Sequence, residues 1–395
     1  MKDTKMKKVL VWETLATISG GQKMTLTVMD LLSAEYEFCC LIPGEGRLSE
    51  ELKKRKIPYV LMGDQTLPKG VKGKKMFFRY GWMSIKYILK SLREIRRYKP
   101  DVLYAPGPAA LPWSAVCGCL TQTPVIWHLH HVFLDTMTRK LLNVCGRWKA
   151  VRKILAVSGC VGDQLPAQAI QNKVEVIYNP VDAVRYGNGN PAQIRQELEQ
   201  LLGKKLIGAA HSGKQIILGQ IALIQRSKKQ DFTLAVLAEM KTQGYDVVGL
   251  FPGECREQDF LDELKQLVCQ LGLEKDVLFL GRREDIPDML KLMDVLIIPS
   301  FEGFPLAGLE AAAAGVPVAA CDIAGAGEFI RVSKNGGCFE ENNAEKAAET
   351  ILRLCTDRET YAENGRLFAA RCSKQRYQVQ LEQTFADPEC SNAVL

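Results

Sequence analysis

The sequence predicts an α/β protein built from two doubly wound domains that face each other across a cleft. Short runs of Val, Ile and Leu alternate with longer helix-like segments, as strands and helices do in this class. The runs are apolar throughout, which is typical of parallel strands covered by helices on both faces. The alternation restarts after a polar, glycine-dotted stretch at 183–215, and 395 residues are enough for two cores.

Each expected strand is one of these apolar runs. In the first half the runs are residues 8–12, 37–42, 59–62, 101–104, 125–128, 153–157 and 174–178. In the second half they are residues 216–224, 246–251, 277–280, 295–299 and 317–321. We therefore expect a parallel sheet in each half.

We place the domain boundary at Asn179-Pro-Val-Asp182, directly after the seventh run. This division gives an N-terminal domain at 1–182, a C-terminal domain at 183–372 and a tail at 373–395. Residues from about 357 to 385 indicate helix with no strand after it, and the apolar side of that helix must be buried, for which we consider the first domain. The carboxyl ends of both sheets would surround one cleft, which is the expected active site.

Composition excludes several classes of protein. Apolar residues make up 47% and charged residues 25% of the chain, as in ordinary globular proteins. The most apolar stretch, 102–127, is interrupted by four prolines and predicts no transmembrane helix, and the apolar run at 9–12 is too short for a signal peptide. Thirteen cysteines without a two-residue CxxC spacing indicate reduced thiols and a cytoplasmic protein.

Positive charge is concentrated between Lys69 and Lys99. This basic window has eleven cations against the single acid Glu94, a net charge of +10, which leaves −3 for the rest of a chain of net charge +7. Aromatic and aliphatic residues such as Phe77, Trp82 and Leu89 are interleaved with the cations. The mixture is typical of an amphipathic element on anionic lipid, although a solvated helix with apolar residues packed inward is the alternative. Nucleic acid would be attracted by the same charge, but we expect no nucleic-acid partner.

The segment from Pro299 to Pro317 is the most informative for function. A strand ends at Pro299, a turn follows, and Pro305 is expected at the first position of a helix. The amides of Phe304, Leu306 and Ala307 would form an anion site suited to a diphosphate. Glu302 lies just outside this helix and Glu310 one turn inside it, so one carboxylate can meet a group at the helix tip and the other the hydroxyls of a ribose. Two such acceptors beside a phosphate site describe a nucleotide-sugar binder.

The pair of glutamates eight positions apart, in the setting Ser-x-Glu-Gly-Phe-x-x-x-x-Leu-Glu-Ala, resembles the retaining glycosyltransferases of family 4, also called glycosyl transferases group 1. Further matches follow in the order of that family along nearly the whole chain. They are Gly20-Gly21, residues 124–130, 157–158 and 176–182, Lys228 with Asp231, and residues 277–281 and 322–328. The resemblance implies a GT-B fold of two Rossmann-like domains.

The resemblance also implies a reaction. The chain would move a sugar from a nucleoside diphosphate sugar, its co-substrate, to a hydroxyl of an acceptor glycan, glycolipid or small molecule, with retention at the anomeric carbon. No metal or other cofactor is expected, since no Asp-x-Asp occurs and the histidines at 128, 130 and 131 have no matching carboxylate pair. The glycine-rich stretch at 187–192 is a poor dinucleotide fingerprint, which disfavours an NAD enzyme.

Roles for individual residues follow from the same resemblance. The catalytic residues would be Glu302, His130 and Lys228, with Lys228 neutralising the leaving diphosphate and the other two orienting the donor sugar. The donor-binding residues would be Gly20, Gly21, Lys228, Arg282 beside the base, Phe304, Leu306, Ala307 and Glu310. The N-terminal domain, with its glycine loop and basic window, would receive the acceptor. Three histidines carry little weight: His128 is expected to be packed, His131 to cap a loop, and His211 to have no role.

The sequence departs from the family at two places. Ala222-Leu223 replaces the usual Gly-Arg, and Lys229 replaces a glycine. Loss of the arginine removes half of a cationic clamp, which Arg226, Lys229, Arg282 or Arg283 could replace. Two alternatives therefore stay open, a nucleotide-sugar epimerase and a non-catalytic protein of the same fold that binds a nucleotide sugar or a partner.

Overall fold

A computed structural model describes residues 6–63, 74–208 and 214–386, with the backbone alone for 74–79. The chain forms two compact units, Met1–Asn179 with Gln375–Leu395, and Pro180–Lys374. The crossings between the units follow Asn179 and Lys374, close to the boundaries placed from the sequence after 182 and 372. Lys69, Lys72, His211 and Cys390, which entered the sequence analysis, lie outside the described residues.

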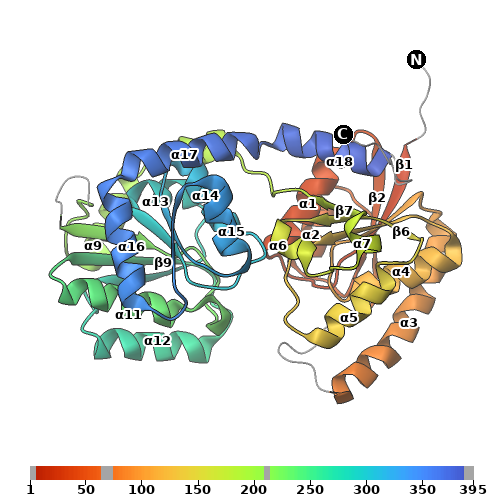
Figure 1. Cartoon of the computed structure of the whole chain (residues 1–395), viewed down its shortest axis with the longest axis horizontal. Helices are drawn as coiled ribbons and strands as arrows, with labels where there is room; N and C mark the ends of the chain where they lie inside the picture. The colour runs from red at the N-terminus through yellow and green to blue at the C-terminus, as the bar shows by residue number, and fades with distance from the viewer. Residues whose placement is uncertain (1–5, 64–73, 209–213, 387–395) are drawn as a thin grey trace. The chain divides into compact units, whose positions relative to one another are not determined.

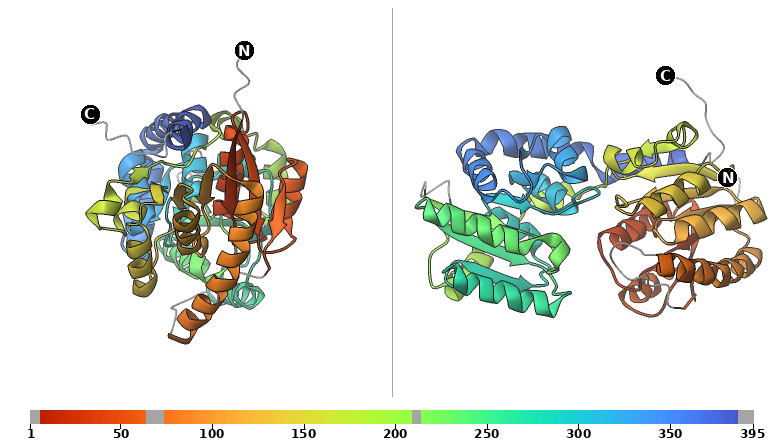
Figure 2. Two further views of the ribbon diagram at one scale, coloured as in Figure 1. Left: turned by 90° about the vertical axis from the view of Figure 1, so that its right-hand side faces the viewer. Right: turned by 60° about the horizontal axis from the view of Figure 1, so that its bottom comes forward.

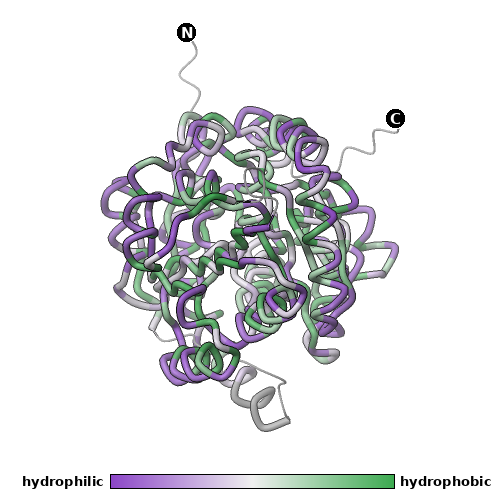
Figure 3. The backbone as a smooth tube through the Cα atoms, turned by 90° about the vertical axis from the view of Figure 1, so that its left-hand side faces the viewer, coloured by the Kyte–Doolittle hydropathy of each residue, from purple (hydrophilic) through white to green (hydrophobic). Residues whose placement is uncertain are grey.

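Each unit contains one sheet of parallel strands with helices on both sides, so the predicted α/β class of two doubly wound domains is confirmed (Figure 1). Further views show the strands of each unit between its helices (Figure 2). Hydrophobic residues gather along the interior strands, while the outer helical turns carry the hydrophilic ones (Figure 3). This distribution follows from the all-apolar strand sequences, which leave neither face of a sheet suited to water.

The sheet of the first unit has the strand order β3-β2-β1-β4-β5-β6-β7. Its strands are β1 (Lys7–Trp12), β2 (Tyr36–Ile42), β3 (Tyr59–Leu61), β4 (Val102–Ala105), β5 (Val125–Leu129), β6 (Val151–Ala156) and β7 (Val174–Val176). Its helices are α1 (Gly20–Leu32), α2 (Arg47–Lys54), α3 (Lys74–Tyr98), α4 (Ala110–Thr121), α5 (Thr136–Cys145), α6 (Gly159–Asp163) and α7 (Gln168–Gln171). All seven strands overlap the runs predicted from the sequence.

The last helix, α18 (Lys374–Ala386), packs on the sheet of the first unit. The ring of Phe385 lies 5.7 Å from that of Tyr36 and 5.5 Å from that of Tyr104, measured between centroids. The Thr384 hydroxyl donates a hydrogen bond to Glu175 in β7. Helix α18 is therefore held on strands β2, β4 and β7 of the first unit.

The sheet of the second unit has the strand order β10-β9-β8-β11-β12-β13. Its strands are β8 (Gln215–Gly219), β9 (Asp246–Pro252), β10 (Val277–Gly281), β11 (Val295–Ile298), β12 (Val318–Cys321) and β13 (Gly336–Phe339). Its helices are α8 (Ala183–Gly187), α9 (Ala192–Leu202), α11 (Gln230–Thr242), α12 (Gln258–Gln270), α13 (Ile286–Leu292), α14 (Leu306–Ala314), α15 (Ala324–Ser333), α16 (Ala344–Thr356) and α17 (Arg358–Arg371), with the 3₁₀ turn η1 (Arg226–Lys228).

Two strand predictions in the second unit were wrong. The strand β13 was missed because Gly336 and Gly337 give it no apolar run, and it is held at the sheet edge by pairing with β12. The expected strand at 216–224 was too long, since β8 ends at Gly219. Beyond that point the chain crosses so near the loop after β9 that a Cβ atom on Gly253 would lie 1.7 Å from the Ala222 carbonyl oxygen.

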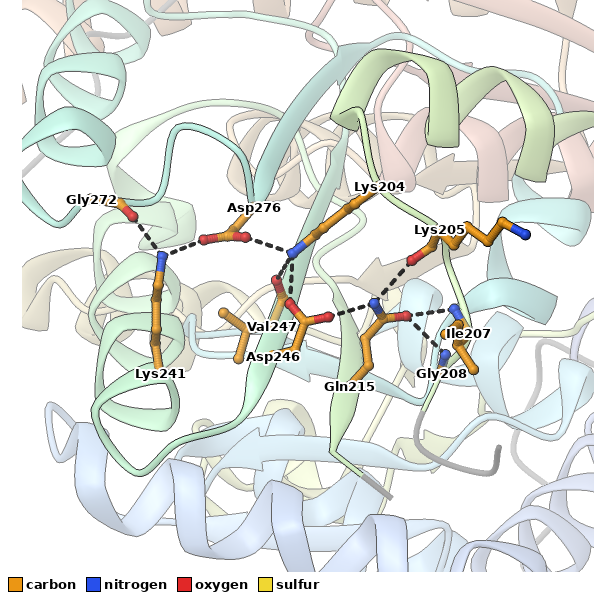
Figure 4. Close-up of polar contacts among 10 residues, drawn as sticks. All are labelled: Lys204, Lys205, Ile207, Gly208, Gln215, Lys241, Asp246, Val247, Gly272 and Asp276. Atoms are coloured by element: carbon orange, nitrogen blue, oxygen red, sulfur yellow. Dashed lines mark hydrogen bonds and ion pairs between the residues drawn. The ribbon is translucent and has the colours of Figure 1, made fainter. Parts of the chain in front are cut away.

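A closed network of polar groups holds the amino edge of the second sheet (Figure 4). The Lys204 ammonium lies 2.7 Å from Asp246 and 2.6 Å from Asp276, and Lys241 lies 2.6 Å from the other oxygen of Asp276. Burial acts to raise the pKa of Asp276, but hydrogen bonds from the two lysines outweigh it and hold that pKa below its usual value. Two lysines and two aspartates balance in charge, so this edge needs no ligand.

Two further properties bear on the sequence predictions. No helix within the described ranges combines the length and hydrophobicity that a membrane crossing requires. The twelve cysteines of the described residues are all free thiols.

Candidate functional site

The strand order of each sheet reverses once, between β1 and β4 in the first unit and between β8 and β11 in the second. Ligands of open parallel sheets bind outside the carboxyl ends of the strands at such a switch point. In the second unit Lys228 follows β8 and Glu302 follows β11. In the first unit Gly20 and Gly21 follow β1. These four predicted residues therefore follow strands at the two switch points, whereas Arg282 follows β10 and His130 follows β5.

Lys228 and Glu302 are in direct contact, although 74 positions separate them in the chain. The Lys228 ammonium nitrogen lies 2.5 Å from Oε1 of Glu302, and both side chains are about one-fifth exposed. The same oxygen accepts a hydrogen bond of 2.8 Å from the Ser300 hydroxyl. Gln220, directly after β8, donates to the Lys228 carbonyl and holds its turn. A cation and a carboxylate thus face each other, half-buried, at the switch point.

The helix α14 begins directly after the Glu302 turn. Its first residue is Leu306 and its N-cap is Pro305, whose ψ of 107° is extended, so the prediction of Pro305 as the first helical residue was wrong by one position. Within the described residues no side chain caps this helix start. The amides of Leu306 and Ala307 belong to the first turn, where a helix has no acceptor of its own for them. Phe304 precedes the helix, and its buried ring packs 5.6 Å from Phe329.

Glycine is required where the Glu302 turn meets the next helix. The amide of Gly325, in the first turn of α15, donates a 2.9 Å hydrogen bond to the Glu302 carbonyl oxygen. A Cβ atom on Gly325 would lie 1.8 Å from the Gly303 carbonyl oxygen. The predicted motif at 322–328 therefore holds the backbone of the Glu302 turn, through the hydrogen bond from Gly325 and the close packing of Gly325 on Gly303.

Glu310 lies one turn inside α14 and has a partner that the sequence analysis missed. Helix α8 packs against α14 and brings the phenol of Tyr186 close to the Glu310 carboxylate. Burial, and then the negative charge of Glu310, raise the pKa of Tyr186, which therefore stays a neutral donor. No signal in the sequence indicated this pair, because Tyr186 lies in α8 at the start of the second unit, far from α14 along the chain. A carboxylate has two oxygens, and one phenol leaves acceptor capacity on it.

The four cations considered as replacements for the missing arginine are each paired with an acid other than Glu302. Arg226 pairs with Glu263, Lys229 with Glu341, Arg282 with Glu284, and Arg283 with both Glu197 and Asp285. Leu223 takes the place of the arginine, and its carbonyl accepts a 2.9 Å hydrogen bond from the buried Gln230. Lys229 has a φ of +53°, which explains why glycine is usual at its position.

At the switch point of the first unit, Gly20 and Gly21 open helix α1. Ser19 is the N-cap, and its amide donates to the Gln22 side chain, which closes a capping box. A Cβ atom on Gly21 would lie 4.0 Å from Cδ2 of His130, which follows β5. The structure therefore brings Gly21 and His130, two of the predicted site residues, together within the first unit.

The three clustered histidines differ in their surroundings. His128 is fully buried, and its Nδ1 lies 2.6 Å from the Tyr104 hydroxyl. The His130 ring lies 4.1 Å from that of His128 between centroids, whereas His131 is exposed. Burial lowers the pKa of His128 to about 3, and burial together with the neighbouring imidazoles lowers that of His130 well below its usual value. Both rings are therefore neutral at physiological pH.

Glu13, directly after β1, is a site residue that the sequence analysis did not identify. It is 1% exposed and accepts hydrogen bonds from Gln22 at 2.9 Å and from Thr25 at 2.5 Å, both in α1. Burial raises the pKa of Glu13, and these hydrogen bonds act against the rise. In the sequence, the only feature that could have identified Glu13 was its position as the first polar residue after the apolar run at residues 8–12. Glu13 ties the start of α1 to the end of β1.

The residues that the structure describes contain no cluster of side chains suited to bind a metal ion. In those residues no group of three or more His, Cys, Asp or Glu side chains is arranged to hold an ion. The charges at the second switch point come from Lys228, Glu302 and the helix start instead.

Two family profiles match the chain one after the other. The family described as Glycosyltransferase Family 4 matches residues 18–185, and the family described as Glycosyl transferases group 1 matches residues 207–367. The first match contains Gly20, Gly21 and His130, and the second contains Lys228, Glu302 and Glu310. Together they cover both units.

Individual relatives agree with the family matches. The Escherichia coli UDP-Gal:alpha-D-GlcNAc-diphosphoundecaprenol alpha-1,3-galactosyltransferase is 23% identical over 375 residues, which covers 91% of this chain and 90% of that protein. The capsular polysaccharide biosynthesis glycosyltransferase CapM of Staphylococcus aureus is 24% identical over 301 residues, covering 71% and 75%. Among solved structures, Anabaena HepE in complex with UDP-glucose has a TM-score of 0.77 at 22% identity, covering 96% of this chain and 99% of that one. This likeness shows the fold.

Proposed function

This chain belongs to the family 4 glycosyltransferases and has the predicted GT-B fold, and we propose that it moves a sugar from a nucleoside diphosphate sugar to an acceptor hydroxyl with retention at the anomeric carbon. The observation that carries the proposal is the Lys228–Glu302 pair beside the uncapped start of α14, at the switch point of the second sheet. A diphosphate needs a cation and free donors, and this position offers both.

The donor's diphosphate would lie at the start of α14. The helix dipole and the amides of Leu306 and Ala307 favour an anion there. Lys228 would leave its contact with Glu302, or share it, to neutralise the charge that develops on the leaving group. Since this charge is met by an ammonium and by amides, the proposal includes no metal ion. Arg282, directly after β10, would border the nucleotide base, as the family resemblance implies.

Carboxylates would hold the hydroxyl groups of the donor. Glu310, close to the Tyr186 phenol, has two carboxylate oxygens that accept hydrogen bonds and would take the ribose hydroxyls. Glu302 would accept from hydroxyls of the transferred sugar, and the family resemblance gives His130, a neutral imidazole, the same task. Both roles need acceptors fixed in place, and Glu302 is fixed by Lys228 and Ser300.

Retention would result from attack on the face that the diphosphate leaves. The bond between the anomeric carbon and the diphosphate oxygen breaks, and the acceptor oxygen bonds to the same face of that carbon. The acceptor's proton passes to the departing phosphate oxygen, so the protein need not supply a base. In support, Glu302 already bonds to Lys228 and Ser300, as a group that binds rather than attacks would.

The relatives suggest the biological setting. The Escherichia coli relative acts on a sugar attached to diphosphoundecaprenol, and CapM serves capsular polysaccharide biosynthesis, as their descriptions state. We therefore propose a role in polysaccharide, glycolipid or glycoconjugate biosynthesis at the cytoplasmic face of a membrane. Uridine nucleotides are the first donors to test, because HepE was solved with UDP-glucose.

Nucleotide binding tests the proposal directly. A thermal-shift screen of UDP, GDP, ADP and their sugars identifies the ligand, because binding to the native state raises the melting temperature. Calorimetry with that ligand then compares the wild type with Glu310→Ala, which we expect to weaken binding by about tenfold or more because a ribose hydroxyl loses its acceptor. Glu345→Ala, an exposed acid at the start of α16, is the matched control. Equal affinity of Glu310→Ala and wild type would contradict the assignment.

A non-catalytic member of the family is the second candidate, and Leu223 is the observation that favours it. The cations that could replace the arginine are paired with other acids, so Lys228 would face the diphosphate without them. Such a protein would bind the nucleotide sugar and release no nucleoside diphosphate with any acceptor. An epimerase would instead convert the donor with no acceptor present.

A further inference from the structure

One face of α3 points outward and is composed of large apolar and cationic side chains. Trp82 is 80%, Ile85 58% and Leu89 63% exposed. The other exposed side chains of residues 80–98 are Lys86, Arg93, Arg96 and Arg97. At 100° per residue these positions fall on one side of the helix. We call them the outward face of α3.

The opposite side of α3 is fixed on the first unit. Tyr80 and Tyr87 stack on Trp113 of α4, with ring centroids 5.8 Å and 5.1 Å away. Ser84 accepts a hydrogen bond from Trp113, and Ser91 accepts one from Trp12 of β1. The helix therefore cannot roll to bury its outward face. Trp82, Ile85 and Leu89 are exposed although the buried side of α3 already has its apolar partners.

A single acid offsets only part of the charge of the outward face. Glu94 is the single acid in residues 80–98, and it is buried, 3.8 Å from Arg97. Lys86, Arg93 and Arg96 form no ion pair within the part of the chain that the structure describes. A solvated helix of ordinary composition mixes both signs, whereas this face combines positive charge with exposed Trp, Ile and Leu.

The position of α3 in the fold relates this face to the first switch point. A crossover helix runs opposite to its strands, so the Trp82 end of α3 lies at the carboxyl edge of the first sheet. The Tyr80 hydroxyl confirms it by donating to the carbonyl of Ala109, which follows β4. The helix lies on the outer side of that unit (Figures 1 and 2). The apolar half of the outward face is thus at the edge from which the loops of Gly20 and His130 emerge.

We propose that the outward face of α3 lies on a bilayer of anionic lipids. Trp82, Ile85 and Leu89 would enter the boundary between headgroups and acyl chains, and Lys86, Arg93, Arg96 and Arg97 would meet lipid phosphates. A bilayer takes both kinds of side chain, whereas the phosphate backbone of a nucleic acid takes only the cations. The inference goes beyond the proposed function and stands on α3 alone, since it needs neither a donor nor a turnover.

Flotation with lipid vesicles tests the proposal. Vesicles of phosphatidylcholine with 30% phosphatidylglycerol should carry the wild-type chain, and vesicles of phosphatidylcholine alone should carry far less. Lys86→Glu/Arg93→Glu/Arg97→Glu should lower partitioning roughly a hundredfold, because each cation near an anionic surface contributes about a fivefold factor. Trp82→Ser/Ile85→Ser/Leu89→Ser should lower it by roughly tenfold or more at unchanged charge.

A triple charge reversal elsewhere is the matched control. Lys265→Glu/Lys275→Glu/Lys346→Glu changes the net charge equally at exposed positions of the second unit and should leave partitioning within about threefold of wild type. The proposal is overturned if wild type ignores anionic vesicles, if the control loses as much as the α3 variants, or if the apolar variant partitions like wild type. Tighter binding to an RNA oligonucleotide than to vesicles overturns it as well. Calorimetry on the same variants should show unchanged nucleotide affinity, so that a failure of membrane binding can be told apart from a failure of the proposed function.

Discussion

The two switch points share a topology but differ in charge. In the second unit the groups at the switch point are ionic, with Lys228 and Glu302 2.5 Å apart beside a helix start without a side-chain cap. In the first unit the corresponding groups are neutral or have neutral partners, since Glu13 is bonded by Gln22 and Thr25 and burial keeps His128 and His130 uncharged. Two sheets built alike therefore offer different chemistry at the same structural position.

This difference in charge indicates which part of a substrate each unit is suited to bind. A diphosphate carries formal charge and is stabilised by an ammonium and a helix dipole, which the second unit supplies. Hydroxyl groups carry no formal charge, so neutral acceptors such as His130 can also hold them in buried surroundings, where an unpaired charge would cost several kcal/mol. The contrast supports a donor diphosphate in the second unit and hydroxyl chemistry in the first, as the proposed function requires.

The largest effect is expected from removing the cation of the ionic switch point. Lys228→Ala should lower kcat by about 10² to 10³, since a group that stabilises developing charge in a site contributes about 3–4 kcal/mol to the barrier. Release of nucleoside diphosphate under saturating donor and acceptor measures it. Lys275→Ala, an exposed lysine after α12, should match wild type. If Lys228→Ala had the same kcat as wild type, the charge of Lys228 would play no part in the reaction, and the difference in charge between the two switch points would not explain the mechanism.

A smaller effect, on stability, is expected at the neutral switch point. Glu13→Ala should lower the free energy of unfolding by about 1–3 kcal/mol, because the Gln22 and Thr25 donors lose their acceptor in a buried place. Glu13→Gln keeps an acceptor of nearly equal shape and should lose less. Urea denaturation of the three proteins measures both.

The pH dependence of the free energy of unfolding of Glu13→Gln tests whether the first switch point is neutral. The folded-state pKa of Glu13 is raised, so the folded protein binds more protons than the unfolded chain between the two pKa values. Its contribution to stability is full below the unfolded pKa and is lost as pH rises through the folded pKa. Glu13→Gln should therefore gain in stability relative to wild type as pH rises from 4 to 8. A difference independent of pH would show that folding does not raise the pKa of Glu13.

The smallest effect is expected in the backbone beside Lys228. Lys229→Gly should relieve about 1 kcal/mol of left-handed strain and lose an exposed ion pair with Glu341 of about 0–1 kcal/mol, for a net gain of about 0.5 kcal/mol in the free energy of unfolding. Lys334→Gly is the matched control, since Lys334 also has a φ of +53° and forms no ion pair in the described residues, so it should gain the full amount. We also expect Lys229→Gly to bind the nucleotide as tightly as wild type, because Lys229 is paired with Glu341 and would not belong to the cationic clamp on the diphosphate. A tenfold loss of affinity would instead show that Lys229 is part of the clamp.

Most of the fold could be predicted because buried parallel strands are apolar on both faces, and a run such as 153–157, which overlaps β6, is visible without any partner. The exceptions were β13 and the end of β8. Gly336 and Gly337 are strand residues only because β12 offers them an edge, and residues 220–224 turn away because the loop after β9 passes close to them. Both depend on neighbours that are distant in the chain.

The sequence by itself determined the two α/β units, the order of the motifs and, to within one residue, the start of the helix near Pro305, because apolar periodicity and Gly, Pro and Glu spacing act over a few residues. Only the tertiary structure decided which side chains meet: Lys228 with Glu302, Tyr186 with Glu310, and Glu13 with Gln22 and Thr25. It also decided that the outward face of α3 stays exposed, since helical periodicity gives the two faces of a helix but not the one that the sheet covers. Such pairings arise from packing between elements far apart in the chain, and no local pattern encodes them.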